Sequence, residues 1–435
     1  MTDTSLMSVE NIQNKFKGKI LAFPRIIYLL FYVFALYLVL PFYDVPLLGL
    51  SLSAPIFFII AAVTVLKPPR PWFRAYRGWI LIAVLIWLGI FISAAANGLL
   101  SGGVNIDTSG ISLTIHYAYW LLVFVITAYF ASQGDMLKRI SEVLGWGVLA
   151  LALLRLLEVV LYGNVGAWTR THWLEQNAYG VLFSTYSPFL LLRILEEKRW
   201  KKLLAVAGTL TLWAAAAING SRGSWVSIAI GLALCLILLA VSRPGKFAGL
   251  LIAVLFIFGL AGAAWTAFPQ VHTSVVDRFN TFQTLDTEKS YMIRQLMIQK
   301  GVRLFEQSPI IGVGAGRFTK SSAPLDIPQI LSYANQAYFN AKSSHNSYLD
   351  FLAESGLVGA IPFGILLITL AWGGFKSAYR FSRKGSYLIL AVFLSFVQMS
   401  IHMWVIASLT NTGNWFIYGL AAAAIVIANK KEPSL

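Results

Sequence analysis

The sequence predicts an all-α polytopic membrane protein with about twelve transmembrane helices and one large, partly helical exterior loop. Its composition is 58% hydrophobic and only 12% charged, with a mean hydropathy of +0.71, which lies far outside the range of soluble proteins. Apolar runs long enough to cross a bilayer recur along the chain, and basic residues gather in short clusters between them. Composition and pattern therefore agree on a chain that crosses a membrane many times.

Twelve apolar runs give the predicted spans, which are residues 26–40, 47–66, 78–96, 114–131, 140–162, 179–194, 203–218, 224–241, 247–268, 348–375, 387–406 and 415–428. The segment between the ninth and tenth runs is the only connection long enough to fold as a subdomain. The predicted organisation is nine transmembrane helices in 1–268, an exterior loop subdomain in 269–347, and three transmembrane helices with a cytoplasmic tail in 348–435.

The distribution of basic residues predicts which side of the membrane each connection faces. With a cytoplasmic N-terminus, the inside segments carry 23 of the 34 Lys and Arg residues, and eight of the others fall in the long exterior loop. Both termini are therefore expected in the cytoplasm. The net charge of +16 follows from this topology and indicates contact with membrane lipids, whereas nucleic-acid binding is not expected. Residues 1–19 are polar, so a cleavable signal peptide is not expected either.

The reactive residue types narrow the kinds of site that the chain can build. Cys235 is the single cysteine and lies in an apolar run, so neither a disulfide nor a cysteine-based metal site is expected. No zinc-binding spacing occurs among the histidines, which are His116, His172, His272, His345 and His402. Neither a metal ion nor a cofactor is predicted.

His345 stands out because it lies beside Asn346 at the exterior mouth of the tenth span. A neutral imidazole in that place could accept a proton at ambient pH, so His345 is a candidate general base; the alternative is a helix-end histidine that only forms hydrogen bonds. A helix capped by Ser343 or Ser344 would contain His345 in its first turn.

The helix that follows His345 carries a stripe suited to close packing against another span. Helical spacing brings onto this stripe Leu349, Leu352, Gly356 and Gly359. Asp350 and Glu354 lie on a side well away from His345, so neither is expected to orient its imidazole.

Two arginines occur in short exterior connections that are otherwise almost free of basic residues, Arg170 and Arg222. Arg222 precedes the eighth span, and a helix N-terminus together with a guanidinium favours an anion such as a phosphate. The alternative for both is an arginine that reaches the lipid headgroups or caps a neighbouring helix. Arg294 falls on an amphipathic helix predicted over 290–305, where the pattern alone indicates an ordinary solvated charge.

Two further polar features are predicted to be structural. Arg155 and Glu158, three residues apart within the fifth span, are expected to pair with each other. The glycine-rich GVGAGRF at 312–318 matches no nucleotide-binding motif and is expected to form a tight turn, although its amides could also help to hold an anion.

Three segments together carry a resemblance to a known family: SRGSW at 221–225, SPIIGVGAGRF at 308–318 and HNSYLDFLAESGLVG at 345–359. Of these, the histidine motif is the most specific. The chain resembles the O-antigen ligase and O-antigen polymerase superfamily of bacterial envelope glycosyltransferases. The motifs run from about Arg170 to Gly359, and the layout of many spans with one late loop is similar over the whole chain.

The resemblance implies a GT-C-like, metal-independent and inverting glycosyltransferase of the bacterial inner membrane. The donor would be a glycan on undecaprenyl diphosphate, and the acceptor a sugar hydroxyl of lipid A-core on the periplasmic face. His345 matches the family's general base, with Asn346 beside it in a supporting role. Arg222 and Arg294 match the arginines that bind the diphosphate, and Arg170 is a looser third match.

Several functions are compatible with these motifs. An O-antigen ligase is favoured because the chain has about twelve spans and one large exterior loop. An O-antigen polymerase would join two lipid-linked glycans, and a protein O-oligosaccharyltransferase would modify serine or threonine. A transporter or lipid flippase belongs to a different class, and it predicts that Arg155 and Glu158 matter more than His345.

Overall fold

The computed structural model describes residues 25–40, 46–47, 50–51, 53–66, 72–100, 108–162, 175–267, 275–276, 279–280 and 288–430. Within these ranges the regular structure is helical except for a two-residue antiparallel pair, β1 (Pro46–Leu47) with β2 (Leu50–Ser51). The helices of the first half are α2 (Arg25–Tyr37), α3 (Ser53–Leu66), α4 (Trp72–Leu100), α5 (Thr108–Ala131), α6 (Met136–Tyr162), α7 (Gln176–Leu191), α8 (Arg193–Glu196) and α9 (Arg199–Asn219). The remaining helices are α10 (Arg222–Ser242), α11 (Pro244–Ala267), α13 (Lys289–Gln307), the 3-10 turn η3 (Gln329–Leu331), α14 (Gln336–Asn340), α15 (Ser347–Arg383), α16 (Leu388–His402) and α17 (Thr412–Asn429).

Every predicted span overlaps an apolar helix, as expected of a multi-pass membrane protein. Eight helical segments among the described residues are long and apolar enough to cross a bilayer: α4, α5, α6, α7 continued by α8, α9, α10, α15 and α17. Shorter apolar helices lie in α2, α3, α11 and α16. The polytopic, helical class is thus confirmed, while twelve as the number of crossings stays a prediction.

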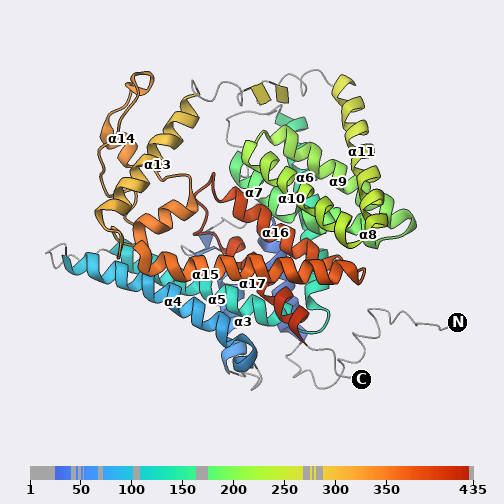
Figure 1. Cartoon of the computed structure of the whole chain (residues 1–435), viewed down its shortest axis with the longest axis horizontal. Helices are drawn as coiled ribbons and strands as arrows, with labels where there is room; N and C mark the ends of the chain where they lie inside the picture. The colour runs from blue at the N-terminus through green and yellow to red at the C-terminus, as the bar shows by residue number, and fades with distance from the viewer. Residues whose placement is uncertain are drawn as a thin grey trace.

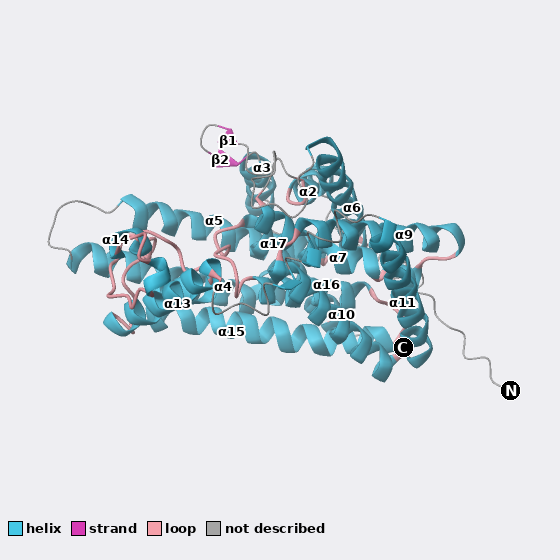
Figure 2. Cartoon of the chain, turned by 90° about the horizontal axis from the view of Figure 1, so that it is seen from above, coloured by secondary structure: helices cyan, strands magenta, loops and turns pink. Residues whose placement is uncertain are grey.

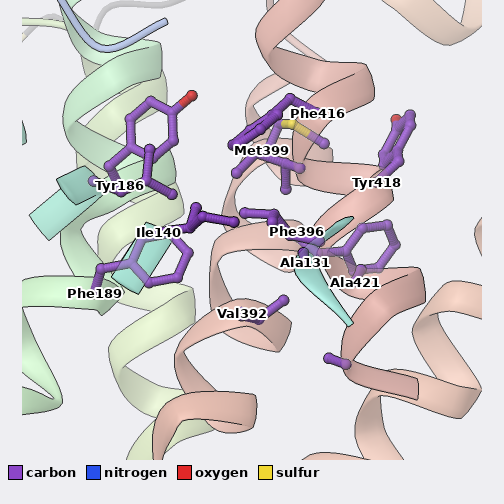
Figure 3. Close-up of a cluster of buried hydrophobic side chains, with 14 of the residues drawn as sticks. Ala131, Ile140, Tyr186, Phe189, Val392, Phe396, Met399, Phe416, Tyr418 and Ala421 are labelled. Atoms are coloured by element: carbon purple, nitrogen blue, oxygen red, sulfur yellow. The ribbon is translucent and has the colours of Figure 1, made fainter. Parts of the chain in front are cut away.

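The core of the bundle joins helices that are distant in sequence. The closest pairs are α5 with α17, α4 with α15, and α7 with α16. Figure 3 shows part of this core, where Phe189 of α7 and Phe396 of α16 lie among aliphatic and aromatic neighbours. Large apolar side chains also point outward, such as Val160, which is 80% exposed, and Ile368, which is 70% exposed. Such an outer surface is suited to lipid rather than to water.

Helix α15 is bent at Gly356, where the backbone has a φ of +57° and a ψ of −162°. The predicted stripe is therefore interrupted, because a regular helix cannot pass through that conformation. Gly356 lies against the backbone of Ile310 and Gly312, whereas Gly359 lies against Gly89 of α4. Gly359 thus packs closely against another span as predicted, but Gly356 serves the loop connection instead.

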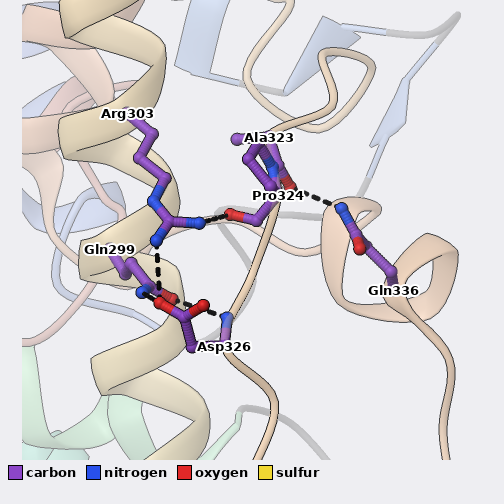
Figure 4. A network of polar contacts seen from close by, with 6 residues as sticks. All are labelled: Gln299, Arg303, Ala323, Pro324, Asp326 and Gln336. Atoms are coloured by element: carbon purple, nitrogen blue, oxygen red, sulfur yellow. Dashed lines mark hydrogen bonds and ion pairs between the residues drawn. The ribbon is translucent and has the colours of Figure 1, made fainter.

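Helices α13 and α14 form a small subdomain at one end of the bundle (Figures 1 and 2). Helix α13 confirms the amphipathic helix predicted over 290–305, and it buries Leu296 and Met297 against the segment that follows. Figure 4 shows how this segment is held: Arg303 forms an ion pair with Asp326, with 2.7 Å between Nη2 and Oδ2. The subdomain therefore has an apolar cluster and a polar clasp of its own.

The charged pair predicted inside the fifth span is present in α6. Arg155 Nη1 lies 3.0 Å from Glu158 Oε2, and both side chains are almost completely buried. The guanidinium also stacks 5.7 Å from the ring centre of Tyr179. Mutual neutralisation reduces the cost of burying two charges, which supports a structural role for the pair.

Candidate active site

Three of the predicted site residues come together from three different elements. His345 precedes α15, Arg294 lies on α13, and Arg222 is the first residue of α10. Each is within electrostatic reach of the next, His345 of Arg294 and Arg294 of Arg222. Arg170 lies outside the described residues, so its predicted role stays a prediction.

His345 lies in a tight turn before α15 rather than in its first turn, which corrects the predicted position. The cap is Asn346, whose side-chain Oδ1 accepts the N–H groups of Tyr348 and Leu349, each at 3.1 Å. Ser344 is not the cap because its hydroxyl is used inside the turn, 2.8 Å from both the N and the O of Asn346. Asn346 thus starts the helix that follows His345, while its expected supporting role in the reaction stays a prediction.

The backbone of His345 is left-handed, with a φ of +54°. Residues other than glycine rarely adopt this backbone conformation, so contacts with neighbouring residues must stabilise it. The amide of Ser344 donates to Asp350 Oδ1 at 3.1 Å, and Ser347 Oγ donates to the carbonyl of Ile406 at 2.6 Å. Both bonds anchor the backbone of the turn on either side of His345.

Arg222 is paired with a carboxylate that the sequence patterns did not reveal. Its Nη1 lies 2.7 Å from Glu288 Oε2, and its Nη2 donates to Glu288 Oε1 at 2.9 Å. The two side chains are only 10% and 13% exposed. Glu288 directly precedes α13, and this position before an amphipathic helix was the available signal in the sequence.

Arg294 is half-buried and has neither a hydrogen bond nor an ion pair with the described residues. Burial is the largest influence on its guanidinium and lowers its pKa, nearby Arg222 lowers it further, and Glu288 opposes this. Among the described residues, Glu288 is the carboxylate that influences both arginines. A guanidinium such as that of Arg294, partly shielded from water and without an ion pair to a described residue, favours an anionic ligand.

The surroundings of His345 favour a neutral imidazole. Burial lowers its pKa, Arg294 and Lys342 lower it further, and Glu175 opposes them. Asp350 and Glu354 are absent from these influences, which agrees with the expectation that neither orients the imidazole. A neutral histidine is equipped to accept a proton.

His402 is a second histidine at this end of the bundle, and no sequence pattern marked it. It is almost fully buried, its Nδ1 lies 3.1 Å from Ser184 Oγ, and it is within electrostatic reach of Arg294. A Cβ at Gly223 would come within 3.2 Å of its Nε2, so the glycine after Arg222 leaves room for this ring. His402 thus packs directly beneath the start of α10.

The amides of the glycine-rich turn bind Glu354 of α15. Its backbone has positive φ at Gly312, Gly314 and Gly316, as a tight turn requires. Phe318 N–H donates to Glu354 Oε1 at 2.9 Å, and Gly314 N–H donates to the carbonyl of Glu354 at 3.1 Å. These amides are engaged by α15, so the turn locks the loop subdomain onto the helix that follows His345.

Lys300 of α13 connects the glycine-rich turn to the end of α14. It is fully buried, and its Nζ donates to the carbonyl of Phe318 at 2.6 Å and also to that of Asn340. Burial lowers the pKa of Lys300 to about 8, against the influence of Asp350 and Glu354. The arginine on α13 and the histidine before α15 are thereby fixed relative to each other. No cluster of histidine, cysteine and carboxylate side chains suited to a metal ion occurs among the described residues.

The fold and this site define a class of protein: a multi-pass membrane protein with a candidate base and two arginines gathered at one end of its bundle. Residues 207–364 match the family model Wzy_C, described as O-antigen ligase, and this match supports an assignment to the O-antigen ligase family. The matched region contains Arg222, Arg294 and His345. It supports a transferase of the O-antigen ligase and polymerase type. A search of curated proteins found no match to the chain.

Proposed function

We propose that this protein is an O-antigen ligase that transfers a glycan from undecaprenyl diphosphate to a sugar hydroxyl of lipid A-core. The observation that carries the proposal is the grouping of His345, Arg294 and Arg222 from three elements, with Glu288 paired to Arg222. This grouping fits a reaction that removes a proton from the acceptor and releases a diphosphate. The family match supports the same class of reaction.

In the proposed reaction the imidazole of His345 takes the proton of the acceptor hydroxyl. The hydroxyl oxygen attacks the anomeric carbon of the donor, and the bond from that carbon to the diphosphate oxygen breaks as the new glycosidic bond forms. Attack from the face opposite to the leaving group inverts the configuration at this carbon. Arg222 and Arg294 stabilise the negative charge that grows on the departing undecaprenyl diphosphate, with Arg170 as a proposed third contributor. Because the guanidinium groups neutralise this charge, the step is proposed to be independent of metal ions.

Glu288 occupies the guanidinium of Arg222, so a donor that binds Arg222 has to displace this carboxylate. A diphosphate carries more negative charge than a carboxylate and offers more acceptor oxygens to a guanidinium. We propose that the donor diphosphate takes the place of Glu288 on Arg222, while Arg294 is ready to bind it without losing a partner. The loop segment that carries Glu288 would move when the donor binds.

The site is proposed to face the periplasm from the inner membrane, with both termini in the cytoplasm. The support is the excess of Lys and Arg in the connections at the other end of the spans. The lipid tail of the donor would lie between transmembrane helices. A transporter is less well supported, because Arg155 and Glu158 satisfy each other inside α6 and polar groups gather at the bundle end instead.

The test uses the purified full chain in detergent with an undecaprenyl-diphosphate-linked glycan, lipid A-core and EDTA. We expect the glycan to move to lipid A-core, and we expect His345→Ala to lower the rate by about 10²- to 10⁴-fold. His116→Ala is a matched control, since this histidine is exposed on α5 and contacts Ser112 of its own helix. A ladder of longer lipid-linked glycan with unmodified lipid A-core would reassign the protein as a polymerase. Full activity of His345→Ala would refute the proposed base.

A further inference from the structure

A cavity lies at the end of the bundle opposite to the candidate active site. Arg222 begins α10 and Arg243 follows its last residue, so about 30 Å of helix separates the two regions. The cavity has a volume of about 580 Å³ and is lined by Ile194, Leu195, Lys202, Arg243, Pro244, Gly245, Lys246 and Gly249. It belongs to no part of the proposed transfer reaction.

The charged side chains that line this cavity are all cationic among the described residues. Lys202 comes from α9, Arg243 from the link between α10 and α11, and Lys246 from the first turn of α11. The carboxylate of nearby Glu196 does not line the cavity and accepts the amide of Tyr387 at 3.0 Å. Within the described part of the chain, the cavity therefore has a lining of positive charge.

Two of the cations are held in place by the backbone. Lys246 Nζ donates to the carbonyl of Leu195 at 3.0 Å, and Arg243 Nε donates to the carbonyl of Ser382 at 3.4 Å. Each keeps further N–H groups for a ligand, because an ammonium has three donors and a guanidinium has five. Lys202 is exposed and makes no hydrogen bond or ion pair with the described residues. The arrangement is thus two fixed cations and one that can move toward a ligand.

The rest of the cavity is apolar and open. A Cβ added at Gly245 or at Gly249 would have no atom within 4 Å, so empty space runs along this side of α11. Apolar side chains next to the cavity point away from the protein, with Leu203 70% exposed and Ile252 68% exposed. Cationic groups above an apolar, outward-facing wall match the two halves of a phospholipid.

We propose that this cavity binds an anionic phospholipid. Its headgroup phosphate lies among Lys202, Arg243 and Lys246, and its acyl chains lie along the exposed apolar faces of α9 and α11. Free phosphate shares the headgroup chemistry, but it makes no use of the open apolar wall. The inference is independent of the proposed transferase function.

The test titrates the detergent-solubilised full chain with dioleoyl phosphatidylglycerol and counts lipid adducts by native mass spectrometry. We expect one phosphatidylglycerol to bind more tightly than phosphatidylcholine. Lys202→Gln should weaken that binding about fivefold, as expected for one basic residue near an anionic lipid. Lys201→Gln is the matched control, because Lys201 is an exposed neighbour in the same turn that does not line the cavity.

A second variant tests the space instead of the charge. Gly249→Leu places a side chain in the cavity, where its Cβ has no atom within 4 Å, and should abolish the preferred adduct, whereas Gly259→Leu should not. Gly259 is equally open and lies on the same helix, so loss of folding would show itself in both variants. Equal binding of the two lipids, unchanged binding by Gly249→Leu, or displacement of phosphatidylglycerol by millimolar inorganic phosphate would each overturn the proposal.

Discussion

Arg222 and Glu288 show how one residue pair can define the resting state of a site. The guanidinium of Arg222 contacts both carboxylate oxygens of Glu288, and both side chains are only slightly exposed. In the proposed function this carboxylate competes with the donor for Arg222, and it also keeps the arginine ordered before the donor arrives. Which effect is larger can be measured through a single substitution.

Glu288→Gln should strengthen donor binding. Removal of the negative charge leaves Arg222 without a competing anion, so we expect the KM for the lipid-linked donor to fall about tenfold, equivalent to ~1.4 kcal/mol. Steady-state kinetics with varied donor concentration measures this. Glu306→Gln, near the end of α13, is the control and should leave KM unchanged. A higher KM in Glu288→Gln would mean that the carboxylate mainly orders Arg222.

The charges around His345 predict the pH dependence of the reaction. Because burial, Arg294 and Lys342 lower its pKa, the imidazole stays neutral to a more acidic pH than an ordinary histidine. We expect kcat/KM to rise with pH and to level off with a midpoint below 6.5, the usual pKa of histidine. Lys342→Gln removes a positive charge that disfavours the protonated ring, so its midpoint should move upward.

A pH–rate profile of the two proteins measures this shift. Lys320→Gln, an exposed lysine of the same subdomain that does not influence His345, is the control. A downward movement of the midpoint in Lys342→Gln, or equal movement in both variants, would contradict the assignment of His345 as the titrating base.

At the scale of elements, the bend of α15 joins the loop subdomain to the membrane bundle. Before the bend the helix is tied to α13 and to the glycine-rich turn, and after it the helix packs against α4. The backbone conformation at Gly356 is essentially limited to glycine. The stability of the junction therefore depends on one residue that has no side chain.

Gly356→Ala should disrupt this junction. The new Cβ would meet the carbonyl oxygen of Ile310 at 2.4 Å in a backbone conformation that alanine avoids, so we expect a loss of at least about 2 kcal/mol of stability. Thermal unfolding in detergent measures it. Gly364→Ala lies on the same helix with open space around it and should be neutral or slightly stabilising. Equal melting temperatures for the two variants would show that the bend is not required.

Sequence patterns predicted the elements better than the contacts between them. Apolar runs located the helices because lipid demands long uninterrupted stretches, and the periodicity over 290–305 predicted α13. The predicted cap residue of α15 was wrong because serine and asparagine are both common at the N-cap position. Only the hydrogen bonds of the turn show that Asn346, and not Ser344, accepts the first amides of the helix. Glu288 and His402 were missed because their partners, Arg222 and Ser184, are distant along the chain.

At the scale of the whole molecule, the proposed active site and the proposed lipid site lie at opposite ends of the same helices. Figures 1 and 2 show α13 and α14 at one end, and the junction of α10 with α11 lies toward the other. The sequence predicts that the first of these ends faces the periplasm. The orientation of the entire bundle can therefore be tested at one position from each end.

Labelling of introduced cysteines tests the orientation. The native Cys235 is fully buried and should stay unlabelled by a membrane-impermeant maleimide. We expect Lys320→Cys, in the loop subdomain, to be labelled in intact spheroplasts, and Lys384→Cys, after α15, to be labelled only after permeabilisation. Both lysines are exposed, so each serves as the control for the other. The reverse pattern would invert the proposed topology.

The ion pair at the start of α10 also has a consequence for selectivity at the bilayer surface. In the proposed topology Arg222 would lie near the level of the phospholipid headgroups, which are far more abundant than any biosynthetic lipid carrier. A singly charged phosphodiester is a weak competitor against a carboxylate that is already bound through both oxygens, whereas a diphosphate is a strong one. Glu288 would then act as a filter that keeps the site clear of ordinary membrane lipids until a carrier with two phosphates arrives.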